Sequence, residues 1–114
     1  MKTKFFTTVF GFIFSIAAFA QQENKTDSFK VYGNCGMCKS TIESSLKKKD
    51  GVISKSWDKN SKMIKVTYNS KKITVKQIGE KIAAAGYDNE YATASEDSYK
   101  KLHECCQYER PKKN

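Results

Sequence analysis

The sequence of 114 residues contains a single proline and a single histidine. After residue 20 it also lacks any apolar run that approaches membrane-spanning length, so no permanent membrane span is expected. The only proline, Pro111, lies near the carboxyl end, whereas thioredoxin-like enzymes place a cis-proline beside their active disulfide. The only histidine is His103, and a lone histidine is more often a surface residue than a metal ligand. These absences argue against a membrane-spanning protein and against a thioredoxin-like enzyme.

The first twenty residues have the pattern of a secretory signal peptide. Lys2 and Lys4 provide a positive start, residues 5–17 form an apolar run, and Ala18-Phe19-Ala20 has the A-x-A form of a cleavage site. We therefore expect an exported protein, periplasmic or secreted after cleavage near Ala20. The alternative, a retained membrane anchor, needs a longer apolar run than this one.

The remaining 94 residues carry 19 basic and 12 acidic side chains, a formal net charge of +7. This length predicts one domain. An excess of basic over acidic side chains can indicate nucleic-acid binding. Here the lysines are spread along the chain, and export argues against a nucleic-acid partner. We interpret the charge as a solvated surface, and the alternative is a docking face for an acidic partner or anionic lipid.

Hydrophobic spacing predicts a β-α-β-β-α-β order, because strands alternate apolar and polar residues whereas helices repeat every 3.6 residues. Thr74 and Gln77 form a capping box at the start of the second helix. Gly51 and Gly86 are expected to end the two helices. The expected strands cover residues 28–32, 52–58, 63–68 and 87–91, and the expected helices cover residues 38–49 and 74–86.

This order predicts an α+β, ferredoxin-like fold, a four-stranded antiparallel sheet with two helices on one face. Within the strand at 52–58, Ile53, Lys55 and Trp57 are expected to share a face. The predicted core consists of Val31, Ile42, Leu46, Val52, Ile64, Val66, Ile78 and Ile82.

Four segments are expected along the chain: a signal peptide (1–20), a flexible leader (21–27), the folded domain (28–92) and a C-terminal extension (93–114). The extension is predicted to hold a short helix on which Tyr99, Leu102 and Cys106 share a face.

Cys35 and Cys38 lie two residues apart in a glycine-containing loop, where the first strand leads into the first helix. The first turn of a helix presents unpaired N–H groups and the positive end of its dipole, and both favour a thiolate. Two thiolates in such a loop can converge on one soft ion, so the motif indicates a metal or redox site. Cu(I) accepts two or three sulfur ligands, whereas Zn(II) prefers four.

The motif and the element order together resemble the heavy-metal-associated domain found in copper chaperones, copper-exporting ATPases and the periplasmic mercury-binding protein. The resemblance covers about 65 residues, and the segments that carry it are Gly33-Asn34-Cys35-Gly36-Met37-Cys38, Gly51-Val52, Val66-Thr67-Tyr68 and Ala85-Gly86-Tyr87.

The resemblance implies that Cys35 and Cys38 bind Cu(I), with Zn(II), Hg(II) and Cd(II) as alternatives, and that Tyr87 packs beside the metal loop. Gly33 stands where the family has a methionine that packs into the core, so a more mobile loop is expected. Lys39 is a candidate to offset the charge of two thiolates; its alternative is an exposed helix lysine.

A second cysteine pair, Cys105 and Cys106, follows His103 in the extension. Because the members of each pair are close in sequence, disulfides within the pairs would constrain little chain. One interpretation is a second soft-metal site formed by Cys105, Cys106 and His103, or extra ligands that fold back onto Cys35 and Cys38. The other is two free or mutually oxidised thiols.

These features favour an exported, monomeric protein that binds and transfers a soft metal, is not an enzyme, and has a metal-transporting ATPase or efflux protein as its partner. One alternative is a thiol–disulfide oxidoreductase that uses Cys35 and Cys38. Another is a metal-sensing partner of an efflux system.

Overall fold

The computed structural model describes residues 23–112. The predicted signal peptide and its cleavage site lie outside the described residues. None of the helices within residues 23–112 has the length and hydropathy of a membrane-spanning helix.

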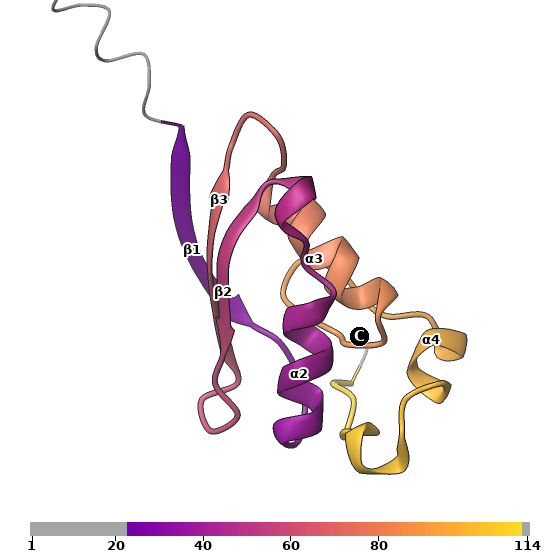
Figure 1. The fold of residues 1–114 in the computed structure, drawn as a ribbon. Coiled ribbons are helices and arrows are strands. Elements are labelled where there is room, and N and C mark those ends of the chain that lie inside the picture. Colours follow the sequence, from indigo (N-terminus) through magenta and orange to yellow (C-terminus); the bar gives the residue numbers. More distant parts are fainter. Residues whose placement is uncertain (1–22, 113–114) are drawn as a thin grey trace, which may run out of the picture.

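A three-stranded antiparallel sheet, in the order β1-β3-β2, forms one layer of the described region. Helices α2 and α3 cover one face of this sheet (Figure 1). The predicted α+β class, with both helices on one side, is therefore confirmed. The strands are β1 (Asn24–Lys30), β2 (Val52–Trp57) and β3 (Met63–Asn69), and the helices are α2 (Gly36–Ser44) and α3 (Val75–Ala84).

Strand β1 starts four residues earlier than expected. Residues 24–27, predicted as part of a flexible leader, pair with the end of β3, from Asn24 opposite Asn69 onward. Two side-chain contacts reinforce this pairing: the Thr26 and Thr67 hydroxyls lie 2.9 Å apart, and the Tyr68 hydroxyl donates to Asp27 at 2.6 Å. Such cross-strand pairs stabilise a sheet even where the sequence lacks apolar alternation.

The expected fourth strand, residues 87–91, is reduced to a single antiparallel bridge between Val31 and Asn89. The chain turns back immediately because the Asn89 N–H donates to the carbonyl of Ala92, while the Asn89 side chain accepts from the Tyr91 N–H. The part of the chain that the structure describes therefore has three strands and a short pairing at the fourth position.

A β-bulge near the start of β2 decides which of its residues face the core. Val52 pairs with Tyr68 but Ser54 pairs with Thr67, so the register shifts between them. The shift allows Val52 and Trp57, five residues apart, both to be buried. The expected shared face of Ile53, Lys55 and Trp57 is wrong, because Ile53 is 46% exposed.

Helix α2 begins at Gly36 and ends at Ser44, five residues before the expected end at Lys49. The Ser44 and Ser45 hydroxyls donate to the carbonyls of Ser40 and Ile42 at 2.6 and 2.7 Å, a contact that competes with continued helix. A single 3₁₀ turn, η3 (Lys48–Asp50), follows.

The predicted start of the second helix is confirmed. In the capping box of α3, the Gln77 N–H donates to the Thr74 hydroxyl and the Thr74 N–H donates to the Gln77 side chain. Gly86 follows the end of α3 in left-handed backbone, with φ of 111°, as expected. Gly51 is also left-handed, with φ of 110°, but it caps η3 rather than the first helix.

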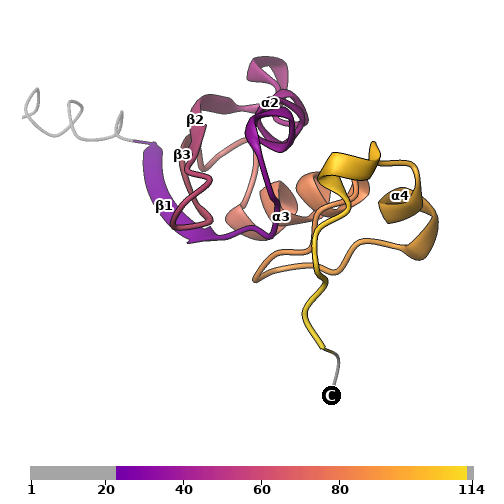
Figure 2. The same ribbon diagram turned by 90° about the horizontal axis from the view of Figure 1, so that it is seen from below.

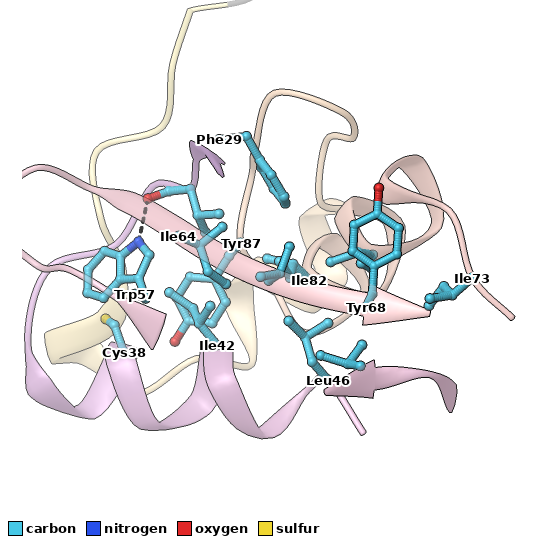
Figure 3. Close-up of a cluster of buried hydrophobic side chains, with 14 of the residues drawn as sticks. Phe29, Cys38, Ile42, Leu46, Trp57, Ile64, Tyr68, Ile73, Ile82 and Tyr87 are labelled. Atoms are coloured by element: carbon cyan, nitrogen blue, oxygen red, sulfur yellow. Dashed lines mark hydrogen bonds between the residues drawn. The ribbon is translucent and has the colours of Figure 1, made fainter. Parts of the chain in front are cut away.

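All eight predicted core residues are buried, none more than 2% exposed. The core also contains large aromatic residues that were not predicted as core, among them Phe29, Trp57 and Tyr87, shown in Figure 3. The Trp57 indole N–H donates to the Val31 carbonyl at 3.0 Å, which joins the end of β2 to the segment that leads into the loop of Cys35 and Cys38.

The C-terminal extension folds against the helices, on the side away from the sheet (Figure 2). It contains the predicted short helix, α4 (Glu96–Lys100), and a separate 3₁₀ turn, η4 (Glu104–Cys106). The expected shared helix face of Tyr99, Leu102 and Cys106 is wrong, because α4 ends at Lys100 and Cys106 lies in η4. All three side chains nevertheless pack on the core.

Candidate metal centre

Cys35 is the residue that precedes the first turn of α2, and Cys38 lies in that turn. The Cys35 thiol is partly accessible, whereas Cys38 is fully buried. Between them, Gly36 and Met37 are exposed, and Met37 retains 46% of its accessible surface. A ligand from solvent would therefore reach the pair through Cys35.

The start of α2 makes Cys35 unusually acidic. Backbone N–H groups of Cys38 and Met37 point at its sulfur and lower the pKa of Cys35 to about 7, against a weaker opposing effect of burial. A substantial fraction of this thiol is therefore ionised at neutral pH, as a metal ligand requires.

We expect iodoacetamide to modify Cys35 with a half-maximal rate near pH 7 in reduced, metal-free protein. Cys106 serves as the internal control, because burial and the neighbouring Cys38 raise its pKa to about 12. Mass spectrometry of digests taken across pH 5–10 measures both sites. A half-maximal rate near pH 9 for Cys35 would contradict the assigned role of the helix start.

Cys38 is held by the polypeptide that surrounds it. It accepts a hydrogen bond from the Asn34 N–H at 3.3 Å and packs with Trp57 and Tyr87 at one end of the core (Figure 3). Gly33 is buried against the same indole, since a Cβ at this position would lie 3.1 Å from two of its ring carbons. Trp57 therefore packs directly against the loop at Gly33, and the expected mobility of the loop finds no support in this packing.

The 3₁₀ turn η4 brings the second cysteine pair to the metal loop. The sulfur atoms of Cys35, Cys105 and Cys106 all lie within 4.8 Å of one another. Cys106 is buried and Cys105 is exposed. The second pair therefore folds back onto Cys35, whereas Cys38 is not in this group of three sulfurs.

Direct contacts join this turn to the loop. The Asn34 side-chain amide donates to the Cys105 carbonyl at 3.2 Å, and the Cys35 thiol faces the same carbonyl at 3.8 Å. The Cys105 and Met37 sulfur atoms lie 3.6 Å apart. The loop and the extension therefore form one surface around Cys35.

A buried aromatic residue anchors the extension after η4. Tyr108 is 2% exposed, and its hydroxyl accepts from the Asp88 N–H at 2.8 Å and donates to the Gly86 carbonyl at 2.9 Å. Its ring stacks on Tyr87 with centroids 5.8 Å apart and meets the edge of Tyr99 at 5.0 Å. These contacts fix η4 from its carboxyl side.

An ion pair anchors the extension further along. Arg110 donates two hydrogen bonds to the Asp88 carboxylate, at 2.8 and 2.9 Å, and a third to the Ala94 carbonyl at 2.6 Å. Asp88 is only 3% exposed. Burial alone would raise the pKa of Asp88, but the hydrogen bonds from Arg110 and from the Ala94 N–H lower it overall.

Tyr87 lies against the cysteines, as the resemblance implied, and carries an unpaired hydroxyl. The side chain is fully buried, and within the described residues its oxygen has no hydrogen-bond partner. Burial and the neighbouring sulfurs of Cys106 and Cys38 raise the pKa of Tyr87. A buried donor without an acceptor is uncommon and destabilising, and a thiolate on either sulfur would supply the acceptor.

Replacing Tyr87 by phenylalanine tests this hydroxyl, with Tyr108→Phe as the matched control. We expect Tyr87→Phe to leave the free energy of unfolding of the metal-free protein unchanged or higher, because no hydrogen bond is lost. Tyr108→Phe should lower it by about 1–3 kcal/mol, because two buried backbone groups lose their partner. Urea titration followed by circular dichroism measures both, and equal losses would show that Tyr87 is paired.

Two other predicted site residues are placed differently. The Lys39 ammonium donates to Glu43 at 2.6 Å and to the Trp57 carbonyl at 3.0 Å, so Glu43 compensates its charge. His103 is exposed and is not part of the three-sulfur cluster, although it lines a surface hollow with Tyr87 and Cys106.

The residues that hold the extension were missed from the sequence. Asp88 has no spacing that marks Tyr108 and Arg110 as its partners, because they follow it by 20 and 22 residues. Asn34, next to Cys35, was visible as part of the loop, but its contact with Cys105 depends on the folded extension.

Residues 30–88 match the model of the heavy-metal-associated domain family. The copper chaperone CopZ of Staphylococcus aureus is 38% identical over 55 residues, which cover 48% of this chain and 81% of that protein. A solved CopZ metallochaperone is 35% identical with a TM-score of 0.54, covering 57% of this chain and 98% of that one.

Two further solved structures are similar. The oxidised MerP of Ralstonia metallidurans CH34 is 25% identical with a TM-score of 0.55, over 59% of this chain and 94% of that one. The other is the N-terminal domain of a potential copper-translocating P-type ATPase from Bacillus subtilis, solved in its Cu(I)-loaded state. It is 27% identical with a TM-score of 0.54, over 58% of this chain and 84% of that one. All of these likenesses cover the domain and leave out a large part of this chain.

Proposed function

Because this chain belongs to the heavy-metal-associated domain family, we propose that it is an exported protein that binds Cu(I) through Cys35 and Cys38 and transfers it to a partner. The observation that carries the proposal is the position of these thiols at the start of α2, with Cys35 acidic and accessible. Two neighbouring thiolates suit a soft monovalent ion better than Zn(II), which prefers four ligands. Hg(II), Cd(II) and Zn(II) are the alternative metals.

Transfer would proceed by exchange of sulfur ligands. A partner thiolate would attack the ion from the Cys35 side, where Gly36 and Met37 are exposed, and Cys38 would be the last ligand released because it is buried. This exchange needs no catalytic acid or base, so the protein acts as a carrier rather than as an enzyme.

The proposed partner is a metal-transporting ATPase or another efflux protein. One similar solved domain comes from a potential copper-translocating P-type ATPase, and a metal site of related shape would allow direct exchange. The proposed mature form is a monomer with a formal net charge of +7, which favours docking to an acidic surface.

Export has its own test. Protein recovered from the non-cytoplasmic fraction should have the mass of a chain that begins at Gln21. Recovery of the full-length chain in the membrane fraction would contradict cleavage and favour the retained anchor.

The binding test measures Cu(I) affinity of the reduced mature chain in competition with a strong chelator. We expect the Cys35→Ser, Cys38→Ser double variant to lose at least a hundredfold in affinity. Because Cys38 is buried, Cys35→Ser alone is measured as well, since a serine at this accessible position leaves the core intact. Unchanged affinity in both variants would refute the proposal.

An insulin-reduction assay separates the carrier from the oxidoreductase alternative. We expect no turnover with dithiothreitol as reductant beyond the rate without protein. Turnover that disappears in Cys35→Ser would favour the enzyme.

A further inference from the structure

We propose that the C-terminal extension completes the metal site, with Cys106 as a third ligand to the ion held by Cys35 and Cys38 and with Cys105 beside it. This inference rests on the proposed function, since it assigns further ligands to the same ion. It makes the site one of three or four sulfurs, which retains Cu(I) more firmly than a two-sulfur loop.

The distances suit one ion. A metal–sulfur bond of about 2.3 Å places the sulfurs of a tetrahedral or trigonal site about 3.8–4.0 Å apart. The sulfurs of Cys35, Cys105 and Cys106 are already within 4.8 Å of one another without an ion. Cys38 is not in this group of three, but Cys106 lies against it in the core cluster. Cys106 is therefore the extension sulfur that neighbours both the group of three and Cys38. A closure of about 1 Å would bring the sulfurs of Cys35, Cys105 and Cys106 to the separation that one ion requires.

The extension is held in place independently of any metal. Before η4, Tyr99 and Leu102 pack against the core. After η4, Tyr108 is buried and Arg110 forms its ion pair with Asp88. A ligand set that is positioned in advance loses less conformational freedom when the ion binds, which raises affinity. A tail with no role at the loop would not need anchors on both sides of its cysteines.

The unpaired Tyr87 hydroxyl is a second, independent indication. Its oxygen is buried and has no hydrogen-bond partner within the described residues. The polar atoms beside it are the sulfurs of Cys106 and Cys38. When either sulfur becomes a thiolate bound to the ion, it can accept this hydrogen bond. Each thiol that binds releases its proton to solvent, so no other reactant is required.

The experiment uses the reduced mature chain loaded anaerobically with one equivalent of Cu(I). X-ray absorption gives the number of Cu–S ligands, and chelator competition gives the affinity. We expect three or more sulfur ligands to copper in the parent and two in the Cys105→Ser, Cys106→Ser double variant. The double variant should still bind Cu(I), with an affinity at least tenfold lower than that of the parent. Cys106→Ala is a second variant that avoids burying a hydroxyl, and urea titration of each metal-free variant checks its fold.

The outcomes separate this inference from the proposed function. The inference would be overturned if the parent had only two Cu–S ligands. It would also be overturned if all extension variants had the same number of Cu–S ligands and the same Cu(I) affinity as the parent. Either result would leave the loop site intact. Tight binding by Cys35→Ser, Cys38→Ser would instead refute the loop site on which both depend. A copper–sulfur count that falls from three to two in Cys106→Ala, but not in Cys105→Ser, would assign the third ligand to Cys106.

Discussion

Replacing Arg110 by alanine is expected to release the C-terminal extension from the rest of the domain. The packing of the extension against the domain should become less stable by about 3–5 kcal/mol. The reason is that Asp88 is 3% exposed and would remain as a buried carboxylate without its cation. Removal of one member of a buried ion pair is far more destabilising than loss of a surface pair. Amide hydrogen exchange of residues 93–112 measures the release, with the rest of the domain as the reference.

Two control variants make this result interpretable. Lys112→Ala removes an exposed positive charge two residues away and should change exchange in the extension little. Asp88→Asn in the Arg110→Ala background should recover part of the loss, because an amide is less costly to bury unpaired than a charge. Unchanged protection in Arg110→Ala would show that Tyr108 alone holds the extension.

The same ion pair gives the extension a dependence on pH. The pKa of Asp88 is lowered in the folded protein, so its stabilising contribution is complete above its unfolded value of about 3.9. That contribution is lost as the pH falls through the lower folded pKa. Acid should therefore release the extension below about pH 4, whereas pH values between 5 and 7 should not.

Replacing Trp57 by alanine is expected to destabilise the whole domain by about 3–5 kcal/mol. The side chain is 1% exposed, and it packs against Gly33 and Cys38. Its loss would leave a cavity under the metal loop and remove the hydrogen bond to the Val31 carbonyl. Because Trp57 is the only tryptophan, urea unfolding is followed by circular dichroism rather than by fluorescence.

Met63→Ala is the matched control, since Met63 lies in the neighbouring strand but is 38% exposed. It should change the free energy of unfolding by less than about 0.5 kcal/mol. A loss below 1 kcal/mol for Trp57→Ala would mean that the loop repacks around the missing ring. In that case Gly33 would not depend on the indole for its packing.

The helices and the core were predictable from the sequence because their signals are local. The capping box of Thr74 and Gln77, the left-handed glycines and the spacing of Ile78 and Ile82 each describe a few consecutive residues. The resemblance to the family also rested on a short loop with two cysteines, and the family match over residues 30–88 confirms it.

Strand ends and strand faces were less predictable, since they depend on a neighbour in space. The early start of β1 depends on its pairing with β3. Which side chains of β2 face the core depends on a bulge between Val52 and Ser54. The fourth strand failed to extend because Asn89 bonds to its own local backbone.

The sequence by itself determined the kind of chemistry available to this protein: two pairs of thiols, one of them at the start of a helix, in a chain with a single histidine. Only the tertiary structure decided that the second pair lies beside the first. That placement depends on the contacts of Asp88 with Tyr108 and Arg110, which lie 20 and 22 residues further along the chain. Contacts over that separation leave no periodic pattern in a sequence, because they depend on how the folded elements pack and not on the order of neighbouring residues.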